Sequence, residues 1–464
     1  MRQDLRQRLL SCNQGGILPH WDKLSPHEQS SVERQLEAID LEFLANLFAK
    51  RTIPFALPDI EKITAVPVLH PTTNFTEAKK EGINALAKGE VAILMVAGGQ
   101  GSRLGTLQPK GTWPITPITQ KSLFELHSEK VLTLSKKANR DIPFLIMTSP
   151  ATHDQTVTFF TSHEFFGLKK EQVIFFTQGT MPAVDLNTGA ILFEEPAKVF
   201  ASPDGHGGTL TALKKTGLLE QLKAQGIKHL FFFQVDNPLV QIADPVFIGH
   251  HISHRSQLSS KVILKESPTD KLGNFIQVNG RCQIIEYSDL PLELANRKKH
   301  DGSLFIDTGN PAIHLFDIDF LNLVCSNAAA LPFHLARKKV PHVDANLCKV
   351  VPEKENAWKF ERFIFDIFPL AERWLLVSTK RDEEFAPLKN AQGDDSPETA
   401  KLAQCKLFIQ WLEKAGLKTP AYSTTPEIEI SPSFAMDAEE LSQKLPNNFQ
   451  VKFPLLLHDN LKEI

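Results

Sequence analysis

The segment VAILMV at residues 91–96 runs directly into AGGQGSRLG at residues 97–105, and PKG follows at residues 109–111. Six apolar residues without polar alternation are typical of a strand that is covered on both faces, as in a parallel sheet flanked by helices. Glycines allow positive φ angles and a close approach of the backbone, so successive N–H groups of such a loop can bind phosphate oxygens. The strand and its loop therefore predict an α/β fold that binds its ligand at the carboxyl ends of strands.

Four further apolar runs of strand length follow, and segments of helical composition alternate with them. The runs lie at residues 144–147, 173–176, 230–235 and 262–264, and the helical segments include residues 122–137 and 209–224. Strands that alternate with helices are typical of βαβ units. We therefore expect a Rossmann-like α/β domain with a mostly parallel sheet over residues 86–385.

Two smaller parts are expected to flank this domain. Residues 1–85 are predicted to form a helical region, in which an apolar stripe follows the helix start at Ser25-Pro26. The stripe consists of Val32, Leu36, Ile39, Phe43 and Leu47. Residues 386–464 are predicted to form a C-terminal domain, because the polar, turn-rich stretch at 389–397 precedes a helix-like segment and a tail with several prolines.

Composition excludes several classes of protein. The chain has 464 residues, of which 42% are hydrophobic and 23% charged, and its formal net charge is −3, so disorder and general nucleic-acid binding are not indicated. The N-terminus is charged and lacks the apolar region of a signal peptide, and no run approaches the roughly 20 apolar residues of a membrane helix. The five cysteines are never spaced C-x-x-C. We expect a cytoplasmic protein, by default a monomer, that contacts neither nucleic acid nor membrane.

The glycine-rich loop can be compared with three known types. A P-loop needs Gly-Lys-Ser/Thr, but here Lys110 precedes Gly111, and a dinucleotide fingerprint needs a third glycine where this chain has Leu104. The third type, G-x-G-[ST]-R-[LM] with a lysine several residues later, belongs to nucleotidyltransferases that act on sugar phosphates. Arg103 and Lys110 favour this type, because two cations can neutralise a triphosphate while one of its phosphoryl bonds breaks. A glycine-rich turn with two solvated cations is the simpler alternative.

From residue 94 to about residue 394, the chain resembles eukaryotic-type UDP-N-acetylglucosamine pyrophosphorylases, a branch of the UTP-dependent sugar-1-phosphate uridylyltransferases. Some ten blocks carry the resemblance in order. They are LMVAGGQGSRLG (94–105), PKG (109–111), FFGLKKEQVIFFTQGTMPA (165–183), SPDGHGG (202–208), VDNPLV (235–240), IIEYSDL (284–290), GNPAIH (309–314), KKVPHVD (338–344), FIFDIF (363–368) and EFAPLKNA (384–391). The resemblance implies a nucleotidyltransferase domain and a reaction in which UTP and a sugar 1-phosphate give a UDP-sugar and pyrophosphate.

The resemblance also implies roles for individual residues. Arg103 and Lys110 would bind the triphosphate, and Asp236, at the end of the most hydrophobic strand, would bind Mg²⁺, which prefers one or two carboxylates together with phosphate oxygens and water. Lys389 would bind the sugar phosphate, although a solvated surface lysine is the simpler interpretation. The nucleotide itself would be held by Gly98, Gly99, Gly101, Gln178 and Gly205, with Gln178 matching the uracil edge through its amide.

The residues give two different indications of the identity of the sugar. The sugar-binding residues implied by the resemblance are His206, Gly273, Glu286, Asn310 and Phe365. Acetylglucosamine enzymes have Asn where this chain has His206, whereas glucose and broad-specificity UDP-sugar enzymes have a Gly-His-Gly turn. The blocks as a whole favour N-acetylglucosamine 1-phosphate, and His206 favours glucose 1-phosphate or several sugars.

Two other functions remain open from sequence alone. An NAD(P)-dependent oxidoreductase could use a similar sheet, but the displaced third glycine disfavours it. A non-catalytic sensor of nucleotide sugars would not need Arg103, Lys110 and Asp236 together.

Overall fold

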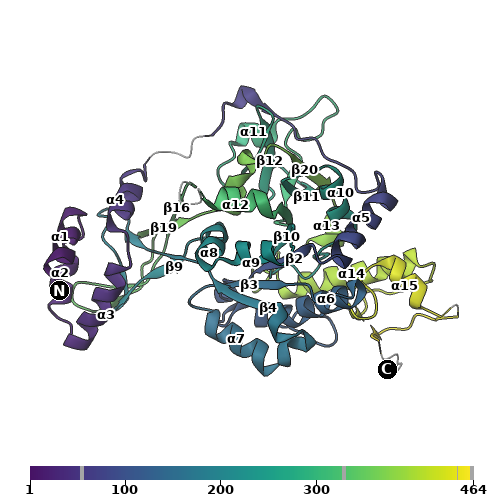
Figure 1. The fold of residues 1–464 in the computed structure, drawn as a ribbon, viewed down its shortest axis with the longest axis horizontal. Coiled ribbons are helices and arrows are strands. Elements are labelled where there is room, and N and C mark those ends of the chain that lie inside the picture. The colour runs from purple at the N-terminus through teal and green to yellow at the C-terminus, as the bar shows by residue number, and fades with distance from the viewer. Residues whose placement is uncertain (53–56, 327–330, 447, 460–464) are drawn as a thin grey trace. The chain divides into compact units, whose positions relative to one another are not determined.

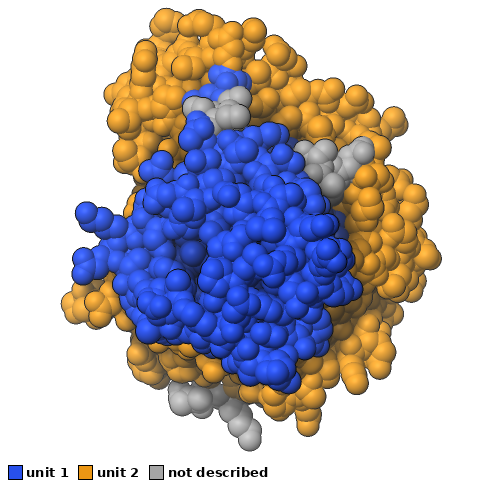
Figure 2. All heavy atoms as spheres, turned by 90° about the vertical axis from the view of Figure 1, so that its left-hand side faces the viewer, with its two compact units in different colours: residues 1–58, 178–212, 327–366 blue, residues 59–177, 213–326, 367–464 orange. Residues whose placement is uncertain are grey.

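The computed structural model describes residues 1–52, 57–326, 331–446 and 448–459. The chain forms two compact units, and each is assembled from three separate stretches (Figure 2). Unit 1 comprises Met1–Pro58, Gln178–Ala212 and Asn327–Asp366, and unit 2 comprises Asp59–Thr177, Leu213–Ser326 and Ile367–Ile464. This division differs from the three consecutive domains expected from the sequence, because stretches far apart in the chain pair with one another within each unit.

Unit 2 contains an 11-stranded sheet among the described residues (Figure 1). All five predicted apolar runs are strands of this sheet. They correspond to β2 (Val91–Val96), β3 (Phe144–Thr148), β4 (Val173–Thr177), β10 (His229–Gln234) and β11 (Leu258–Leu264). The strands β10, β2, β3 and β4 are neighbours in this order, and each pair is parallel. The predicted α/β class is therefore confirmed.

The other half of the sheet is mixed rather than parallel. The strand β15 (His314–Asp317) lies antiparallel between β10 and β11, and β14 (Thr308–Asn310) is antiparallel to β11 and to β12 (Gly273–Val278). The remaining strands are β1 (Ile63–Thr64), β13 (Arg281–Ile285) and β20 (Trp374–Ser378). The expectation of a mostly parallel sheet thus applies only to the half formed by β10, β2, β3 and β4. In the other half, β12 and β13 form a hairpin, and the two strands of a hairpin are always antiparallel.

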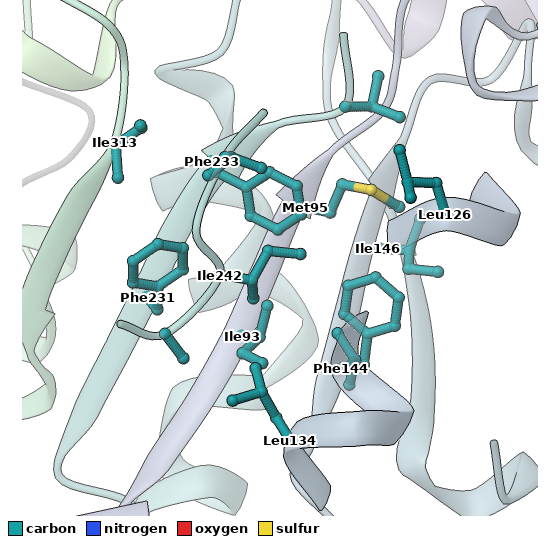
Figure 3. Packing of buried hydrophobic residues seen from close by; sticks show 14 of the residues in the cluster. Ile93, Met95, Leu126, Leu134, Phe144, Ile146, Phe231, Phe233, Ile242 and Ile313 are labelled. Carbon is teal, nitrogen blue, oxygen red and sulfur yellow. The ribbon is translucent and has the colours of Figure 1, made fainter. Parts of the chain in front are cut away.

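The parallel half of the sheet is covered by α6 (Leu123–Ala138), which explains its unbroken apolar strands. The side chains of Leu126 and Leu134 on α6 lie over those of β2 and β3, and Phe231 and Phe233 of β10 continue the same cluster (Figure 3). The helix begins after Ser122, whose Oγ accepts a hydrogen bond from the Glu125 N–H at 3.1 Å, an ordinary N-cap.

The remaining helices of unit 2 surround the sheet or pack on the C-terminal segment. They are α5 (Phe75–Ala87), α7 (His153–Ser162), α9 (Leu218–Ala224), α10 (Pro245–Ser253), α11 (Leu292–Asn296), α12 (Ile318–Ser326), α13 (Arg381–Glu384), α14 (Pro397–Lys414) and α15 (Ala438–Lys444). The predicted helical segment 209–224 is two helices, because Gly217 adopts φ +66° between α8 (Gly208–Thr216) and α9. In the tail, β21 (Ile428–Ile430) and β22 (Leu455–Leu457) pair in parallel.

Unit 1 begins with four helices. These are α1 (Gln3–Ser11), α2 (Ile17–Trp21), α3 (Pro26–Glu37) and α4 (Leu41–Ala49). The predicted start at Ser25 is confirmed by a capping box with Glu28, but the apolar stripe is divided between two helices because Asp40 caps α4. Short strands complete the unit: β5 (Thr180–Pro182), β6 (Val184–Asp185), β7 (Phe193–Glu195), β8 (Lys198–Val199), β9 (Ala201–Pro203), β16 (His334–Lys338), β17 (His342–Val343), β18 (Lys349–Val350) and β19 (Ala357–Glu361).

Among the helices of the described residues, none combines the length and the apolar character needed to span a bilayer.

Candidate active site

A cavity of about 320 Å³ in unit 2 lies against the glycine-rich loop that follows β2. It brings together four charged residues that the sequence analysis selected from three distant stretches of chain. The lining residues are Gln100, Gly101, Ser102, Arg103, Leu104, Lys110, Asp236 and Lys389. Because β2 and β10 are adjacent parallel strands, the loops after them meet at the same edge of the sheet.

The glycine-rich loop is closed by its own backbone. The N–H of Gly101 donates to the Gln108 carbonyl at 2.9 Å, and the N–H of Lys110 donates to the Gly99 carbonyl at 3.0 Å. The Gly98 carbonyl accepts from the Ser149 hydroxyl at 2.7 Å. Gly101 therefore contributes space rather than a donor, since a Cβ there would lie 2.6 Å from the Thr106 methyl group.

The donors of the loop lie on neighbouring residues. Within the part of the chain that the structure describes, the backbone N–H groups of Gly99, Gln100, Ser102 and Arg103 have no hydrogen-bond acceptor. Successive backbone N–H groups without partners are suited to binding an anion. Gln100 and Ser102 were not among the residues predicted from the sequence to bind the nucleotide, although their place between Gly99 and Arg103 indicates the same loop.

Lys110 and Asp236 form an ion pair in the cavity. The Lys110 Nζ lies 3.1 Å from Asp236 Oδ2, and the two side chains are 19% and 11% exposed. The side chain of Arg103 is exposed on the short 3₁₀ turn of Ser102–Leu104. Of the two cations at the glycine-rich loop, Arg103 is therefore exposed and Lys110 is paired with a carboxylate.

Lys389 reaches the same cavity from the segment after α13. The N–H of the preceding Leu388 donates to the Asp236 carbonyl at 2.8 Å, which joins this segment to the end of β10. The N–H groups of Lys389 and Asn390 both donate to the Asp395 carbonyl, at 2.7 and 3.0 Å. Burial raises the pKa of the Asp395 carboxyl, and the positive charge of Lys389 opposes that rise.

The residues of the cavity fit a magnesium ion that arrives with phosphates. Among the described residues, no group of three or more His, Cys, Asp and Glu side chains is arranged to hold a metal. Asp236 provides a single carboxylate, of which Oδ2 accepts from Lys110. Mg²⁺ commonly takes one or two carboxylates, with substrate phosphates and water as the other ligands. Asp236 thus suits a metal shared with substrate better than one held by protein alone.

Three of the expected sugar-binding residues lie together elsewhere in unit 2. Gly273 on β12 is directly opposite Asn310 on β14. A Cβ at Gly273 would lie 3.5 Å from Glu286 Oε1 and 3.6 Å from the Asn310 Cβ. These residues do not line the cavity described above. They form a second group in which a carboxylate and an amide surround a position without a side chain.

The other predicted residues belong to unit 1, where His206 and Phe365 lie together. The His206 Nδ1 accepts from the Ile364 N–H at 3.1 Å, so Nε2 carries the proton of the neutral ring. Burial lowers the pKa of His206 to about 4, and His334 adds to the effect. The ring stacks on Phe363 at 5.4 Å and lies 5.8 Å from Phe365. The His206 ring is therefore uncharged near neutral pH and is held by a hydrogen bond from the backbone.

The turn that carries Gly205 packs around a buried aspartate. Asp204 is 5% exposed, and its N–H donates to the carbonyl of Gly179, the residue after the buried Gln178. Burial raises the pKa of Asp204 to about 6, while Arg362 opposes this rise. Gly205 adopts φ +84°, and a Cβ there would lie 2.3 Å from the Arg362 carbonyl oxygen.

The sequence is similar to that of known proteins along most of the chain. The sequence profile of the UTP–glucose-1-phosphate uridylyltransferase family matches residues 55–452. The chain belongs to this family. The UDP-N-acetylglucosamine pyrophosphorylase of Saccharomyces cerevisiae is 38% identical to it, over 95% of this chain and 96% of the yeast protein. The UDP-N-acetylglucosamine diphosphorylase 2 of Arabidopsis thaliana is 34% identical over 95% and 91% of the two chains.

Solved structures agree with this family membership. The uridine diphosphate N-acetylglucosamine pyrophosphorylase of Trypanosoma brucei, solved with an inhibitor, superposes with a TM-score of 0.79 at 26% identity, over 99% of this chain and 98% of that chain. The predicted resemblance is confirmed, and the protein is a uridylyltransferase of this family. The roles of the individual residues stay predictions.

Proposed function

We propose that this uridylyltransferase transfers the uridylyl group of UTP to N-acetylglucosamine 1-phosphate and releases pyrophosphate. The observation that carries the proposal is that Arg103, Lys110, Asp236 and Lys389 line one cavity beside the unpartnered amides of the glycine-rich loop. Relatives from yeast and Arabidopsis that are named for this sugar support the choice of substrate.

The chemical step needs positioning and charge stabilisation more than proton transfer. An oxygen of the sugar phosphate attacks the α-phosphorus of UTP in line, while the bond from that phosphorus to the oxygen bridging to the β-phosphate breaks. The attacking oxygen is already an anion, so no general base is required. Arg103 and Lys110 would stabilise charge on the departing pyrophosphate, and Lys389 would hold the sugar phosphate.

Asp236 is the residue we expect to hold Mg²⁺. The bound ion would supply a second positive charge at the phosphates, next to Lys110. The hydrogen bond from Lys110 Nζ to Asp236 Oδ2 keeps both groups at the cavity.

A second candidate substrate is glucose 1-phosphate, alone or among several sugars, because His206 stands where acetylglucosamine enzymes have Asn. The neutral ring offers its Nε2–H as a donor, since Nδ1 accepts from Ile364. A site that hydrogen-bonds a particular group of its substrate discriminates strongly against a substrate that lacks this group, because the polar groups of the site are then left unpaired.

Pyrophosphate release from UTP, Mg²⁺ and a panel of sugar 1-phosphates tests both candidates. We expect N-acetylglucosamine 1-phosphate to give the highest kcat/KM, and preferential use of glucose 1-phosphate would overturn that choice. The His206→Asn variant should change the ratio of the two kcat/KM values if the ring sets the preference. No pyrophosphate from any sugar would contradict the proposed reaction.

We further propose that the enzyme works in the cytoplasm as a monomer. Its five cysteines, all free thiols, fit a reducing compartment. Sedimentation at micromolar concentration would reveal a dimer.

A further inference from the structure

Asn237 follows the expected metal-binding aspartate and has no place in the reaction proposed above. Its side chain is 3% exposed and is absent from the lining of the cavity. The Nδ2 donates to the Glu384 carbonyl at 2.8 Å. The Oδ1 accepts from the N–H groups of Ala386, at 3.2 Å, and Leu239, at 3.3 Å. Both ends of this amide are therefore satisfied by backbone.

These bonds join two segments that reach the cavity from different parts of the sequence. Residues 384–386 bind the Asn237 side chain, and the Leu388 N–H donates to the Asp236 carbonyl. Lys389 follows directly after this segment. The position of the Lys389 ammonium relative to the Asp236 carboxylate thus depends on these bonds. Among the described residues, Asn237 makes the only side-chain hydrogen bonds between residues 236–237 and residues 384–388.

The segment that Asn237 binds is itself fixed from behind. The Glu384 side chain is 1% exposed, and its two oxygens accept from Lys261 Nζ at 2.6 and 2.7 Å. Lys261 also donates to Asp244, at 2.9 Å. A buried ion pair with its hydrogen bonds satisfied has little freedom to move. Asn237 is thereby attached to a rigid support.

The turn after Asn237 is also bound by α6. The Nζ of Lys130 donates to the carbonyls of Pro238, at 2.6 Å, and Val240, at 2.9 Å. The turn of Asp236–Val240 is thus hydrogen-bonded to α6, and the Asn237 side chain and the Asp236 carbonyl connect it to the segment that carries Lys389.

We propose that Asn237 is a positioning residue for the uridylyl transfer, which sets the separation of Lys389 from Asp236 so that the two substrates are bound in register. The proposal rests on the proposed function, in which Lys389 binds the sugar phosphate. It predicts a specific defect. Without the Asn237 bonds the sugar phosphate binds weakly, whereas UTP, held mainly by the glycine-rich loop, is less affected.

Two variants and one control test this. Asn237→Asp keeps the shape but replaces the donor to Glu384 with a second acceptor, and Asn237→Ser removes the amide without adding charge. The control is Gln172→Glu, because Gln172 is also a buried amide that donates to a backbone carbonyl, that of Ile142 at 2.8 Å. It lies just before β4, at the end of the strands away from the cavity.

We expect both Asn237 variants to raise the KM for N-acetylglucosamine 1-phosphate about tenfold or more while the KM for UTP changes less than about threefold. Calorimetric titration of the sugar phosphate into enzyme saturated with a non-hydrolysable UTP analogue should show the same loss of affinity. Gln172→Glu should lower the melting temperature without changing the ratio of the two KM values.

Equal changes in both KM values, or a change no larger than in Gln172→Glu, would overturn the proposal. If neither Asn237 variant folds, the residue is needed for folding, and this result would also overturn the proposal. An inactive wild-type enzyme would instead contradict the proposed function.

Discussion

The two glycine-rich turns of this protein have similar compositions but different physical roles. The turn at residues 98–105 in unit 2 lines a cavity, and a Cβ added at Gly99 would meet no atom within 4 Å. The turn at residues 203–208 in unit 1 is tightly packed. A Cβ at Gly205 would lie 2.3 Å from the Arg362 carbonyl, and one at Gly208 would lie 2.0 Å from Asp204 Oδ1.

The difference shows that a glycine-rich sequence has at least two meanings. In the first turn, the absence of side chains leaves backbone N–H groups accessible to an anion beside the exposed Arg103, and Lys110 lies in the same cavity. In the second, it lets one backbone approach another closely. Substitutions should therefore reduce activity in the first turn and stability in the second.

The largest effect is expected from the cations of the first turn. Arg103→Ala and Lys110→Ala should each lower kcat about a hundredfold or more, because a key stabiliser of transition-state charge is lost. Arg103 is exposed, so its removal should leave the melting temperature unchanged. Steady-state pyrophosphate release measures this, with the exposed Arg140→Ala as the control. An unchanged kcat in both variants would contradict the catalytic role proposed for the first turn and its cations.

The next effect concerns the second turn. Gly205→Ala should lower the free energy of unfolding by about 2–4 kcal/mol, because the added methyl collides with the Arg362 carbonyl and the backbone has φ +84°. The control is Gly280→Ala, since Gly280 has φ +81° with no atom near the added methyl and should cost only about 1–2 kcal/mol. Denaturant unfolding of both variants provides the values. Equal losses would show that the close packing is unimportant.

A third effect should appear in the pH dependence of stability. Burial raises the pKa of Asp204 to about 6 in the folded state, above its ordinary 3.8, so the folded protein binds this proton more tightly than the unfolded chain. The resulting stabilisation is complete below pH 3.8 and is lost as the pH rises through 6, by up to about 3 kcal/mol. In Asp204→Asn this part of the pH dependence should be absent.

Denaturant unfolding between pH 4 and 7 measures the difference between wild type and Asp204→Asn. The control is Asp301→Asn, because Asp301 is exposed and hydrogen bonds from Ser303 lower its pKa below 3.8, so its contribution is lost mainly below pH 4 and its removal should change the slope between pH 4 and 7 little. A parallel pair of curves for wild type and Asp204→Asn would contradict the assignment.

The smallest effect on stability is expected at Gly99. Gly99→Ala should change the free energy of unfolding by less than about 0.5 kcal/mol, because nothing surrounds the added methyl. Any loss should appear as a higher KM for UTP. A loss of stability comparable to that of Gly205→Ala would erase the distinction between the two turns.

Most of the residues that line the unit 2 cavity could be predicted from the sequence, because local sequence patterns locate the strands and the loops after them. Apolar runs located the strands, and parallel strands put their following loops at one edge, so Lys110 and Asp236 meet although 126 positions separate them. Which ring nitrogen of His206 carries the proton could not be predicted, since this depends on the hydrogen bond from the Ile364 N–H, 158 positions away. The hydrogen bond from the Gly101 N–H to the Gln108 carbonyl was also not predicted, because the spacing of the glycines does not show which N–H groups bond within the loop.

The pairing of Lys110 with Asp236 has a consequence for how substrate enters. In a nucleoside triphosphate complexed with a divalent cation, the cation already neutralises part of the phosphate charge. If Asp236 holds the cation as proposed, the phosphates would replace Asp236 as the partner of Lys110 and the cation would replace Lys110 as the partner of Asp236, so few ions would be released. Affinity for the complex should then depend on ionic strength less steeply than the number of lysines and arginines around the cavity suggests, and free nucleotide should bind with the steeper dependence of an unpaired polyanion.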